Sequence, residues 1–300
     1  MIDTINIKDD LEYLPKQAKE LQKTHFNWCG FTWIPHFNDS SQPPIYYYVK
    51  LKNLYLKLIG HKLLVSNSLH KLYHNNNYKP FTYSQVVEAF EILNNQLPIK
   101  IFDSKIIKLS AGIVIDEDAQ KVVGEWQYFL GKKYTPMKNK NKIYGAKYFL
   151  TNYQIKGYDK TFEMKNHNQV KLEKPYFRFE IDNCKPNVFN NKTNNIGIYT
   201  VKDIVDKEKY KKLGKMLLDN YIKIKKIPKL DVSTLSIKEK RIYAAINNFE
   251  IKESIRKQHP HMYKKDMIKY KNIIEGCDNS IFQNQVINKL QQQINYSINN

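Results

Sequence analysis

Alternating apolar and polar positions predict β-strands in several parts of the chain. Between Tyr46 and Ser66, apolar residues alternate with lysines on both sides of Gly60, which predicts two strands joined by a turn. The segment Lys105–Asp118 predicts a buried strand followed by an acidic turn. Its alternating apolar positions are Ile107, Leu109, Ala111, Ile113 and Ile115. Aromatic and β-branched residues among periodic lysines continue the strand pattern from 145 to 163.

The clearest strand signal is YFRFEID, at Tyr176–Asp182. Because side chains alternate across a strand, two sets point in opposite directions. The first set is Phe177, Phe179 and Ile181, and the second is Arg178, Glu180 and Asp182. We expect the apolar set to enter the core and the polar set to be available for chemistry.

Helical spacing is present in two regions. Thr82 or Ser84 can cap a helix over VVEAFEILNNQL, which predicts a strand–loop–helix unit ending near 97. After the linker KKIPKLD, which carries Pro228, helical spacing follows over Ser236–Lys271. Its apolar positions are Ile237, Ile242, Ala245, Ile246 and Phe249. The Gln/Asn-rich segment Gln283–Asn300 is expected to fray or to end as a helix.

The net charge of +20 adds the first functional information. A charge of that size attracts polyanions, so nucleic acid is the expected partner. Nearly all of the 49 basic residues are lysines, because the arginines are only Arg178, Arg241 and Arg256. Lysines suit non-specific contacts to backbone phosphates. An AT-rich genome explains part of the lysine content, but it does not by itself create the excess of positive charge.

Several classes of protein are disfavoured by the sequence. No stretch approaches the roughly 20 apolar residues of a membrane span, and the acidic start, with Asp3 and Asp9, is unlike a secretory signal. The cysteines Cys29, Cys184 and Cys277 show no C-x-x-C spacing, so neither a zinc site nor a disulfide framework is indicated. A cytoplasmic protein with no membrane partner is expected.

The fold class that follows is α+β. We expect residues 1–225 to form a domain with a central antiparallel sheet and flanking helices, and residues 226–300 to form a small helical module. The lysines of the module either hold duplex DNA or belong to a solvated helical surface, and the sequence leaves both open.

Two segments carry a resemblance to a known family. QIKGYDKTFEMK, at Gln154–Lys165, and the PYFRFEID strand resemble the tyrosine region of rolling-circle replication initiators, both the gene II-type proteins of filamentous phages and the plasmid initiation factors. The matching residues are Lys156, Tyr158, Asp159, Lys160, Glu163, Arg178 and Glu180. NSLHKLYHNNNY, at Asn67–Tyr78, resembles a loop of the phage-type initiators. The match is scattered over roughly 45 to 210, and it implies an HUH-endonuclease-like fold.

The resemblance implies a DNA-nicking enzyme whose nucleophile is Tyr158. A tyrosine can attack a DNA phosphate and store the bond as a phosphotyrosine ester, but a phenol with a pKa of about 10 needs assistance at neutral pH. On a strand, Lys156, Tyr158 and Lys160 share one face, and the ammonium groups would favour the phenolate. Lys160 is the expected assisting residue.

The same resemblance implies a metal and a DNA surface. Phosphodiester displacement is normally assisted by Mg²⁺ or Mn²⁺ on carboxylates, and the candidate ligands are Glu180, Glu163 and Asp116. The expected DNA-binding residues are Lys71, His70, His74, Asn77, Tyr78, Lys156 and Arg178. Origin or single-stranded DNA is the expected partner, with a host helicase and polymerase as further partners.

Simpler structural interpretations remain open for these residues. Tyr158 is one of 22 tyrosines, Arg178 and Glu180 can form a plain ion pair on a sheet face, and Asp159 can serve only to shape the turn. His70 and His74 have the four-residue spacing of a helical metal pair, but the NNNYKP that follows favours a loop.

Three further positions bear on metal binding and on base stacking. His259-Pro260-His261 is expected at the surface, because proline disfavours the strand of a metal-binding His pair. Ser110 stands where phage-type relatives usually carry an acidic residue, which leaves Asp116 as the nearest carboxylate on that strand. Three aromatic residues beside lysines either stack unpaired bases or pack in the core, namely Tyr73, Tyr78 and Phe81.

Three functions are therefore compared. The first is a rolling-circle initiator that nicks one strand through Tyr158 and keeps the 5′ phosphate. The second is a non-catalytic DNA-binding regulator or degenerate initiator, which would bind DNA in a salt-sensitive way without cleavage. The third, an RNA-binding structural protein, is the weakest, because no aromatic ribonucleoprotein motif is present.

Overall fold

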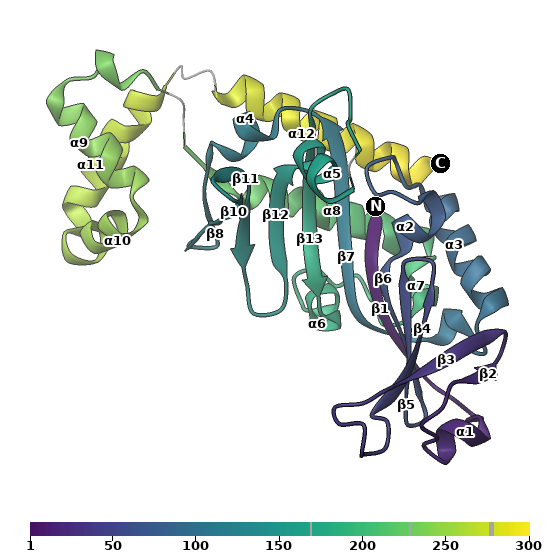
Figure 1. Ribbon diagram of the computed structural model, residues 1–300. Helices are drawn as coiled ribbons and strands as arrows, with labels where there is room; N and C mark the ends of the chain where they lie inside the picture. Colours follow the sequence, from purple (N-terminus) through teal and green to yellow (C-terminus); the bar gives the residue numbers. More distant parts are fainter. Residues whose placement is uncertain (169, 228–229, 276–278) are drawn as a thin grey trace.

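The alternating segments of the sequence pair into one twisted antiparallel sheet. The computed structural model describes residues 1–168, 170–227, 230–275 and 279–300 (Figure 1). The sheet has eleven strands in the order β10-β11-β12-β13-β7-β1-β6-β5-β4-β3-β2. These strands are β1 (Ile2–Asp10), β2 (Phe26–Trp28), β3 (Phe31–His36), β4 (Tyr46–Leu51), β5 (Leu54–Ile59), β6 (Lys62–Ser68), β7 (Lys105–Asp116), β10 (Thr135–Asn139), β11 (Lys142–Phe149), β12 (Gln154–Asp159) and β13 (Tyr176–Cys184). A second, small sheet contains β14 (Lys225–Lys226), β8 (Trp126–Phe129) and β9 (Lys132–Lys133).

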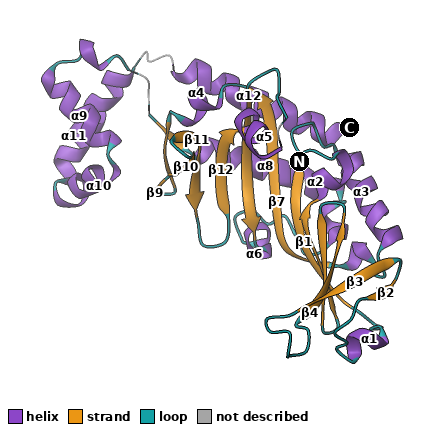
Figure 2. Ribbon diagram, viewed as in Figure 1, coloured by secondary structure: helices purple, strands orange, loops and turns teal. Residues whose placement is uncertain are grey.

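Helices cover one face of the large sheet (Figure 2). The helices α8 and α12 pack against β7 behind the sheet, while α5 lies in front of β13. The helices are α1 (Lys16–Lys19), α2 (Leu69–His74), α3 (Tyr83–Gln96), α4 (Ala119–Val123), α5 (Lys160–Asn168), α6 (Pro186–Asn190), α7 (Val201–Ile204), α8 (Lys207–Lys223), α9 (Ile237–Asn247), α10 (Phe249–Gln258), α11 (Pro260–Ile274) and α12 (Asn279–Asn299), with 3-10 turns at Ile101–Asp103 and Val232–Thr234. The expected α+β class with a central antiparallel sheet is confirmed.

The core lies between the sheet and its rear helices. On β13, the predicted apolar face is confirmed, because Phe177, Phe179 and Ile181 are fully buried. Trp126 and Tyr221 pack edge-on against Phe179, with ring centroids 6.1 and 5.2 Å away. Burial of large aromatic rings is the main source of stability in such a core.

The strand at β7 is confirmed, with one correction to its buried face. Ile107 was expected to point inward, but it is exposed, and Ile106 is buried in its place. The reason is a shift in the pairing of β1 with β7, where Asn6 pairs with Lys108 and Ile7 with Ile106. A bulge of this kind changes which residues face the core.

Two expectations upstream of β7 are corrected. The segment Tyr46–Ser66 forms three strands, β4, β5 and β6, because a second turn at Lys52 has φ +52°. Gly60, with φ +53°, makes the other turn, where a left-handed conformation costs glycine least. The expected loop at His70 and His74 begins as the helix α2, which Ser68 caps by accepting a hydrogen bond from the Lys71 amide.

The C-terminal helices form two groups. The helices α9, α10 and α11 have a small core of their own, built on Ile242, Ile246 and Tyr270, whereas Ile237 is exposed. Of the two expectations for Gln283–Asn300, fraying or a helix, the helix is confirmed, since α12 spans this segment and packs against α8 and β7. Its buried residues are Val286, Leu290, Ile294 and Ile298. The residues from 279 on thus join the sheet domain rather than the expected 226–300 module.

The predicted surface position of His259, Pro260 and His261 is confirmed, since all three are exposed at the start of α11. Pro228 and Cys277 lie outside the described residues. Within the described ranges, no helix combines the length and apolarity that a bilayer-spanning segment requires.

Candidate functional site

The pairing of β12 with β13 brings the YDK tyrosine beside the polar face of the FRFEID strand. Tyr158 lies opposite Arg178, and Lys156 lies opposite Glu180. Directly paired residues of an antiparallel sheet project from the same face, so these four side chains share one surface. That surface faces away from the rear helices and toward α5 and the 75–81 segment.

Arg178 is the centre of this cluster and is only 2% exposed. Its Nη2 donates to Asp3 Oδ2 at 2.7 Å, its Nε to Glu180 Oε2 at 3.2 Å, and its Nη1 to the carbonyl of Asn77 at 2.6 Å. Gly112 makes room for it, since a Cβ there would lie 3.1 Å from Nη2. The fork of one guanidinium therefore ties β1, β13 and the 75–81 segment together.

Asp3 was noted in the sequence only as part of an acidic start, yet it is the direct partner of Arg178. Ser68 Oγ donates to the other oxygen of its carboxylate at 2.6 Å. Burial alone would raise the pKa of Asp3, but the Arg178 guanidinium and the Ser68 hydrogen bond outweigh it and hold this pKa at about 2. The pairing of β1 with β7, which no local pattern encodes, produces this contact.

Tyr158 directs its hydroxyl at the Glu180 carboxylate, which also accepts from Arg178. Its Oη donates to Glu180 Oε2 at 3.3 Å, and the side chain is 6% exposed. Burial, together with the nearby carboxylates, raises the pKa of Tyr158 well above its ordinary value, and Arg178 offsets only part of this rise. Tyr158 is therefore a neutral phenol in a polar, buried environment.

Lys160 follows Tyr158 but is not on the same strand, because β12 ends at Asp159 and Lys160 begins α5. The Asp159 carboxylate accepts from the Phe162 amide at 2.8 Å, which supports its simpler role as a shaper of this turn. Lys160 still reaches the site, with its Nζ 6.0 Å from the Tyr158 ring centroid. Burial lowers the pKa of Lys160 to about 8.

The buried Lys160 ammonium has two partners. Its Nζ donates to Asn77 Oδ1 at 2.8 Å and forms an ion pair with Glu163. Asn77, an expected DNA-binding residue, is buried and thus supports both Lys160 and Arg178 from the loop after α2. The resemblance-based site and the upstream NSLHKLYHNNNY segment are therefore in direct contact.

Lys156 lies between two carboxylates. Its Nζ is 2.6 Å from Asp182 Oδ2 and 3.8 Å from Glu180 Oε1, and these carboxylates raise the pKa of Lys156 although burial opposes them. Ser110 Oγ donates to the other oxygen of Asp182 at 2.6 Å. Asp182, rather than Asp116, is therefore the carboxylate beside Ser110.

The two glutamates assigned to a metal face protein cations. Glu180 contacts Arg178 and Lys156, and Glu163 contacts Lys160. Burial raises the pKa of Glu180 even though these two cations lower it. Across the described part of the chain, no three His, Cys, Asp or Glu side chains are grouped to hold a metal ion.

Asp116 does not join these glutamates. It pairs with Lys174 at 3.1 Å, and its carboxylate is half exposed. On β7 it lies opposite Tyr176, four residues from Gly112, which is the partner of Glu180. At about 3.3 Å per residue, this separation is about 13 Å. The three expected ligands do not converge, so the residues as they lie do not fit the implied metal.

The two histidines of α2 pack inward. His70 is buried, stacks on Phe81 at 4.7 Å, and has its pKa lowered to about 2 by burial, so it is neutral and is not on an exposed DNA-facing surface. His74 is half-buried and bonds through Nε2 to Gln85 Oε1 at 3.0 Å. Lys71, on the same helix, is half-buried. A role for these residues in DNA binding stays a prediction.

A cavity of about 440 Å³ borders the cluster on the Arg178 side. Its walls include Gly112, Tyr176 and the expected DNA-binding residue Tyr78. Phe81, which was either a stacking or a core residue by sequence, is buried in this wall. Arg178 itself also lines this cavity.

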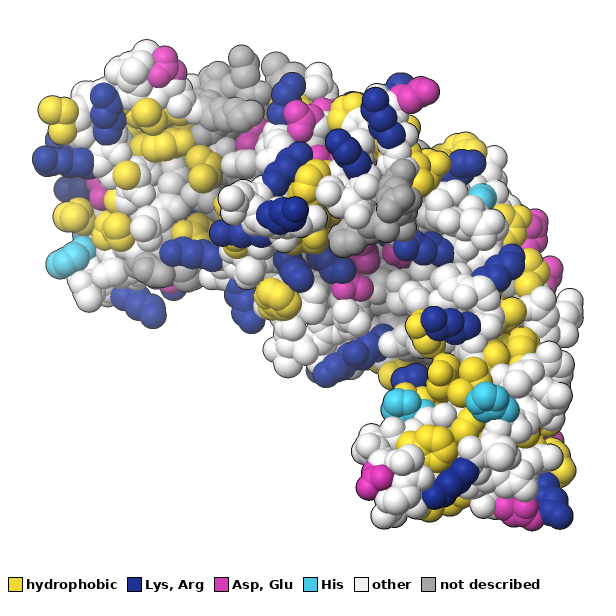
Figure 3. All heavy atoms as spheres, in the orientation of Figure 1, with side chains coloured by type: hydrophobic (Ala, Val, Ile, Leu, Met, Phe, Trp, Pro, Cys, Tyr) yellow, Lys and Arg dark blue, Asp and Glu magenta, His cyan; other side chains and the backbone are white. Residues whose placement is uncertain are grey.

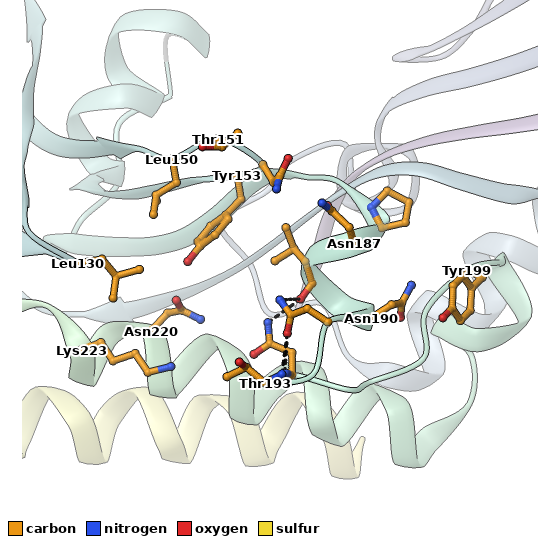
Figure 4. Close-up of a pocket in the computed structure, with 15 residues that line it drawn as sticks. Leu130, Leu150, Thr151, Tyr153, Asn187, Asn190, Thr193, Tyr199, Asn220 and Lys223 are labelled. Carbon is orange, nitrogen blue, oxygen red and sulfur yellow. Dashed lines mark hydrogen bonds between the residues drawn. The ribbon is translucent and has the colours of Figure 1, made fainter.

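A larger cavity, of about 910 Å³, lies at the other end of β12 and β13 (Figure 4). Its wall contains several asparagines, and the side-chain amides of four of them have partners within the chain, namely Asn190, Asn191, Asn194 and Asn220. Asn191 and Asn194 both donate to the Val188 carbonyl, at 3.2 and 2.6 Å, and Asn190 bonds to Ile198 in both directions. These amides therefore shape the loop after α6.

A further surface, not predicted from the sequence, lies on β3, β4 and β5. We define the aromatic platform as His36, Tyr46, Tyr48, Lys50, Tyr55 and Lys57, which line an open depression of about 470 Å³. Figure 3 shows hydrophobic and histidine side chains gathered at the lower right, where Figure 1 draws these strands. The signal was present, because tyrosine and lysine recur at every second position and so share one face, as Tyr46, Tyr48 and Lys50 on β4 and as Tyr55 and Lys57 on β5.

Comparison with known proteins adds no assignment. Neither a protein-family model nor a curated protein matches this chain.

Proposed function

We propose that this protein is a DNA-nicking replication initiator of the rolling-circle type, with Tyr158 as its nucleophile. The observation that carries the proposal is the shared carboxylate of Glu180, which accepts from the Tyr158 hydroxyl at 3.3 Å and from Arg178 Nε at 3.2 Å. Ionisable groups with shifted pKa values gather at functional sites, and here Tyr158, Glu180 and Lys160 are all shifted.

The geometry supports a balanced proton path for the transesterification. As Tyr158 Oη bonds to the DNA phosphorus, its proton passes to Glu180, whose raised pKa makes it a better base than an ordinary carboxylate. The bond from phosphorus to the 3′ oxygen breaks. Lys160, with a pKa of about 8, can give that oxygen a proton, which leaves a 3′ hydroxyl for a polymerase and a phosphotyrosine on the enzyme.

No step of this scheme passes through a metal. Binding of Mg²⁺ or Mn²⁺ stays a prediction of the family resemblance. The carboxylates of Glu180 and Glu163 form ion pairs with Arg178 and Lys160 instead. The scheme does require that the Tyr158 hydroxyl become accessible, since the side chain is 6% exposed. The 75–81 segment, which holds Lys160 and Arg178 through Asn77, is the part that would have to move.

The burial of Tyr158 favours a second candidate, a DNA-binding regulator that does not cleave. In that case the Arg178 cluster is structural, and the basic surface alone carries the function. The two candidates differ in a single observable, the covalent protein–DNA adduct.

The test uses the full-length protein and labelled single-stranded fragments tiled across the DNA on which the gene lies. Adducts are resolved by denaturing electrophoresis, with Mn²⁺, with Mg²⁺ and with chelator, and the modified residue is identified by mass spectrometry. We expect an adduct on Tyr158 that disappears in Tyr158→Phe. The matched control is Tyr144→Phe, because the Tyr144 ring lies 6.4 Å from that of Tyr158.

An adduct that persists in Tyr158→Phe would eliminate the assignment of the nucleophile. Binding without any adduct in the wild-type protein, under all three metal conditions, would establish the regulator instead.

A further inference from the structure

The aromatic platform combines ring faces with basic side chains at the solvent boundary. His36 stacks on Tyr46 at 4.4 Å with an interplanar angle of 18°, and the ring of Tyr48 lies 6.4 Å from that of Tyr46. The Lys57 Nζ lies 4.7 Å above the Tyr46 ring, and the Lys50 Nζ lies 5.0 Å above the Tyr55 ring. Burial in the core does not explain this set, because His36, Lys50 and Tyr55 are exposed.

Strand alternation accounts for the exposure of these rings. In the run YYYVK, Tyr47 points into the core at 2% exposure, while Tyr46 and Tyr48 point outward. Exposed aromatic rings that cluster on a sheet mark interaction surfaces more often than isolated ones do. The described residues that line the depression include no acidic side chain, so its charge complements a polyanion.

The platform and the Arg178 cluster lie on the same face of one sheet. Directly paired residues of an antiparallel sheet share a face. Lys50 pairs with Tyr55, and Tyr55 pairs with Ser66. Ser66 pairs with Asn6 on β1, which in turn pairs with Lys108 on β7. Lys108 in turn shares its face with Ser110, two residues along β7. Four strand spacings of about 4.8 Å separate β5 from β13, and along β7 Lys108 lies six residues, at about 3.3 Å each, from Val114, the partner of Arg178. The platform therefore starts on the order of 30 Å from Arg178.

From this geometry we propose that the aromatic platform is a binding site for single-stranded DNA. Unpaired bases stack on Tyr46, Tyr48 and Tyr55, and each lysine that now covers a ring moves to a backbone phosphate. Single strands fit because their bases have free faces, whereas duplex bases are already stacked on each other. The choice of DNA over RNA rests on the proposed function, since the nicked strand continues across this face.

The binding test does not depend on nicking. A 3′-fluorescein-labelled dT20 oligonucleotide is titrated with the Tyr158→Phe protein in the presence of chelator, and anisotropy gives the Kd. We expect Tyr48→Ala and Tyr55→Ala each to weaken binding roughly tenfold, and Tyr48→Phe, which keeps the ring, to bind like the parent. The control is Tyr13→Ala, because Tyr13 also carries a lysine over its ring, at 5.1 Å, but lies off the platform.

Circular dichroism and thermal unfolding of each variant separate loss of binding from loss of folding. Unchanged dT20 affinity in a folded Tyr48→Ala, Tyr55→Ala double variant would overturn the proposal whatever the nicking assay gives. Equal loss in Tyr13→Ala would overturn it as well. Tighter binding of rU20 than of dT20 by the parent would reject DNA as the occupant.

Discussion

Two regions on the same face of the sheet hold their charges in opposite ways. Around Arg178, charged side chains lie beneath the surface and each one contacts a partner, as in the pairs with Asp3 and Glu180. On the aromatic platform, Lys50 and Lys57 lie over tyrosine rings at the solvent boundary. The side chains of Arg178 and Glu180 are buried, whereas Lys50 and Tyr55 are exposed.

The two regions differ in the hydration of their charged side chains, and this difference suits them to different roles. A desolvated charge is costly unless its partners are in place, so the Arg178 cluster depends on its ion pairs, and the pKa values of Tyr158 and Lys160 are shifted. A solvated lysine keeps its mobility and can exchange an aromatic ring for a phosphate at small cost. We therefore expect substitutions in the cluster to affect folding strongly, and substitutions on the platform to affect mainly binding.

The largest effect is expected from Arg178→Met. Removal of the guanidinium leaves Asp3 and Glu180 buried without their cation, which should lower the free energy of unfolding by about 3–5 kcal/mol. Urea denaturation measures the change. The matched control is Arg256→Met, whose pair with Glu253 is exposed on α10 and should contribute little. A loss for Arg178→Met as small as that for the control would mean that the cluster is hydrated.

A smaller effect is expected from the titration of Lys160. Its pKa falls from 10.5 to about 8 in the folded protein because of burial, so between these pH values the unfolded chain holds a proton that the folded one has lost. Stability from this group therefore rises with pH. Relative to Lys160→Met, wild-type unfolding free energy should increase by on the order of 3 kcal/mol from pH 8 to pH 10.5.

The subtraction removes the contributions of Lys225 and Lys226, whose pKa values burial also lowers to about 8. A difference that stays flat over this range would show that Lys160 is hydrated, and it would remove the proposed proton donor for the 3′ oxygen.

The sequence predicted the two faces of β13 because alternation is a local property. Phe177 and Phe179 enter the core, and Arg178 and Glu180 share the other face. Alternation could not predict Asp3 as a partner, because that contact joins residues 175 positions apart and depends on β1 inserting between β6 and β7. Long-range strand order leaves no periodic signal in the sequence.

Other differences have local causes that could have been noticed. Lys52 makes a turn with positive φ, although lysine is not a usual turn residue, so the pattern predicts two strands where three form. The histidines of α2 pack inward because Ser68 caps a helix before the asparagine run. On the platform, the alternation of apolar residues with lysines predicts strand structure over Tyr46–Ser66, but it does not distinguish a solvated face from a binding surface.

The platform side of the comparison can be sharpened by salt dependence. Each lysine that contacts a phosphate releases counterions, and for a single strand the slope of log K against log salt changes by about 0.7 per contact. Lys50→Gln and Lys57→Gln should each reduce the dT20 slope by about that amount. Lys19→Gln serves as the control, because Lys19 covers the ring of Tyr13 off the platform. If Lys50→Gln and Lys57→Gln leave the slope as unchanged as Lys19→Gln does, the platform lysines do not contact the strand.

The smallest effect is expected in the stability of Tyr48→Ala. Tyr48 is half-buried on the outer face, opposite Lys57, so its loss removes cross-strand contact but creates no cavity, and the free energy of unfolding should fall by about 1 kcal/mol or less. Urea denaturation measures the change, with Tyr148→Ala as the reference for a buried ring. Tyr148 is fully buried, so its loss should lower the free energy of unfolding by about 3–5 kcal/mol. If Tyr48 contributes little to stability but strongly to dT20 binding, its ring serves binding rather than folding. A large loss of stability in Tyr48→Ala would instead make the platform part of the core and would erase the contrast with Arg178.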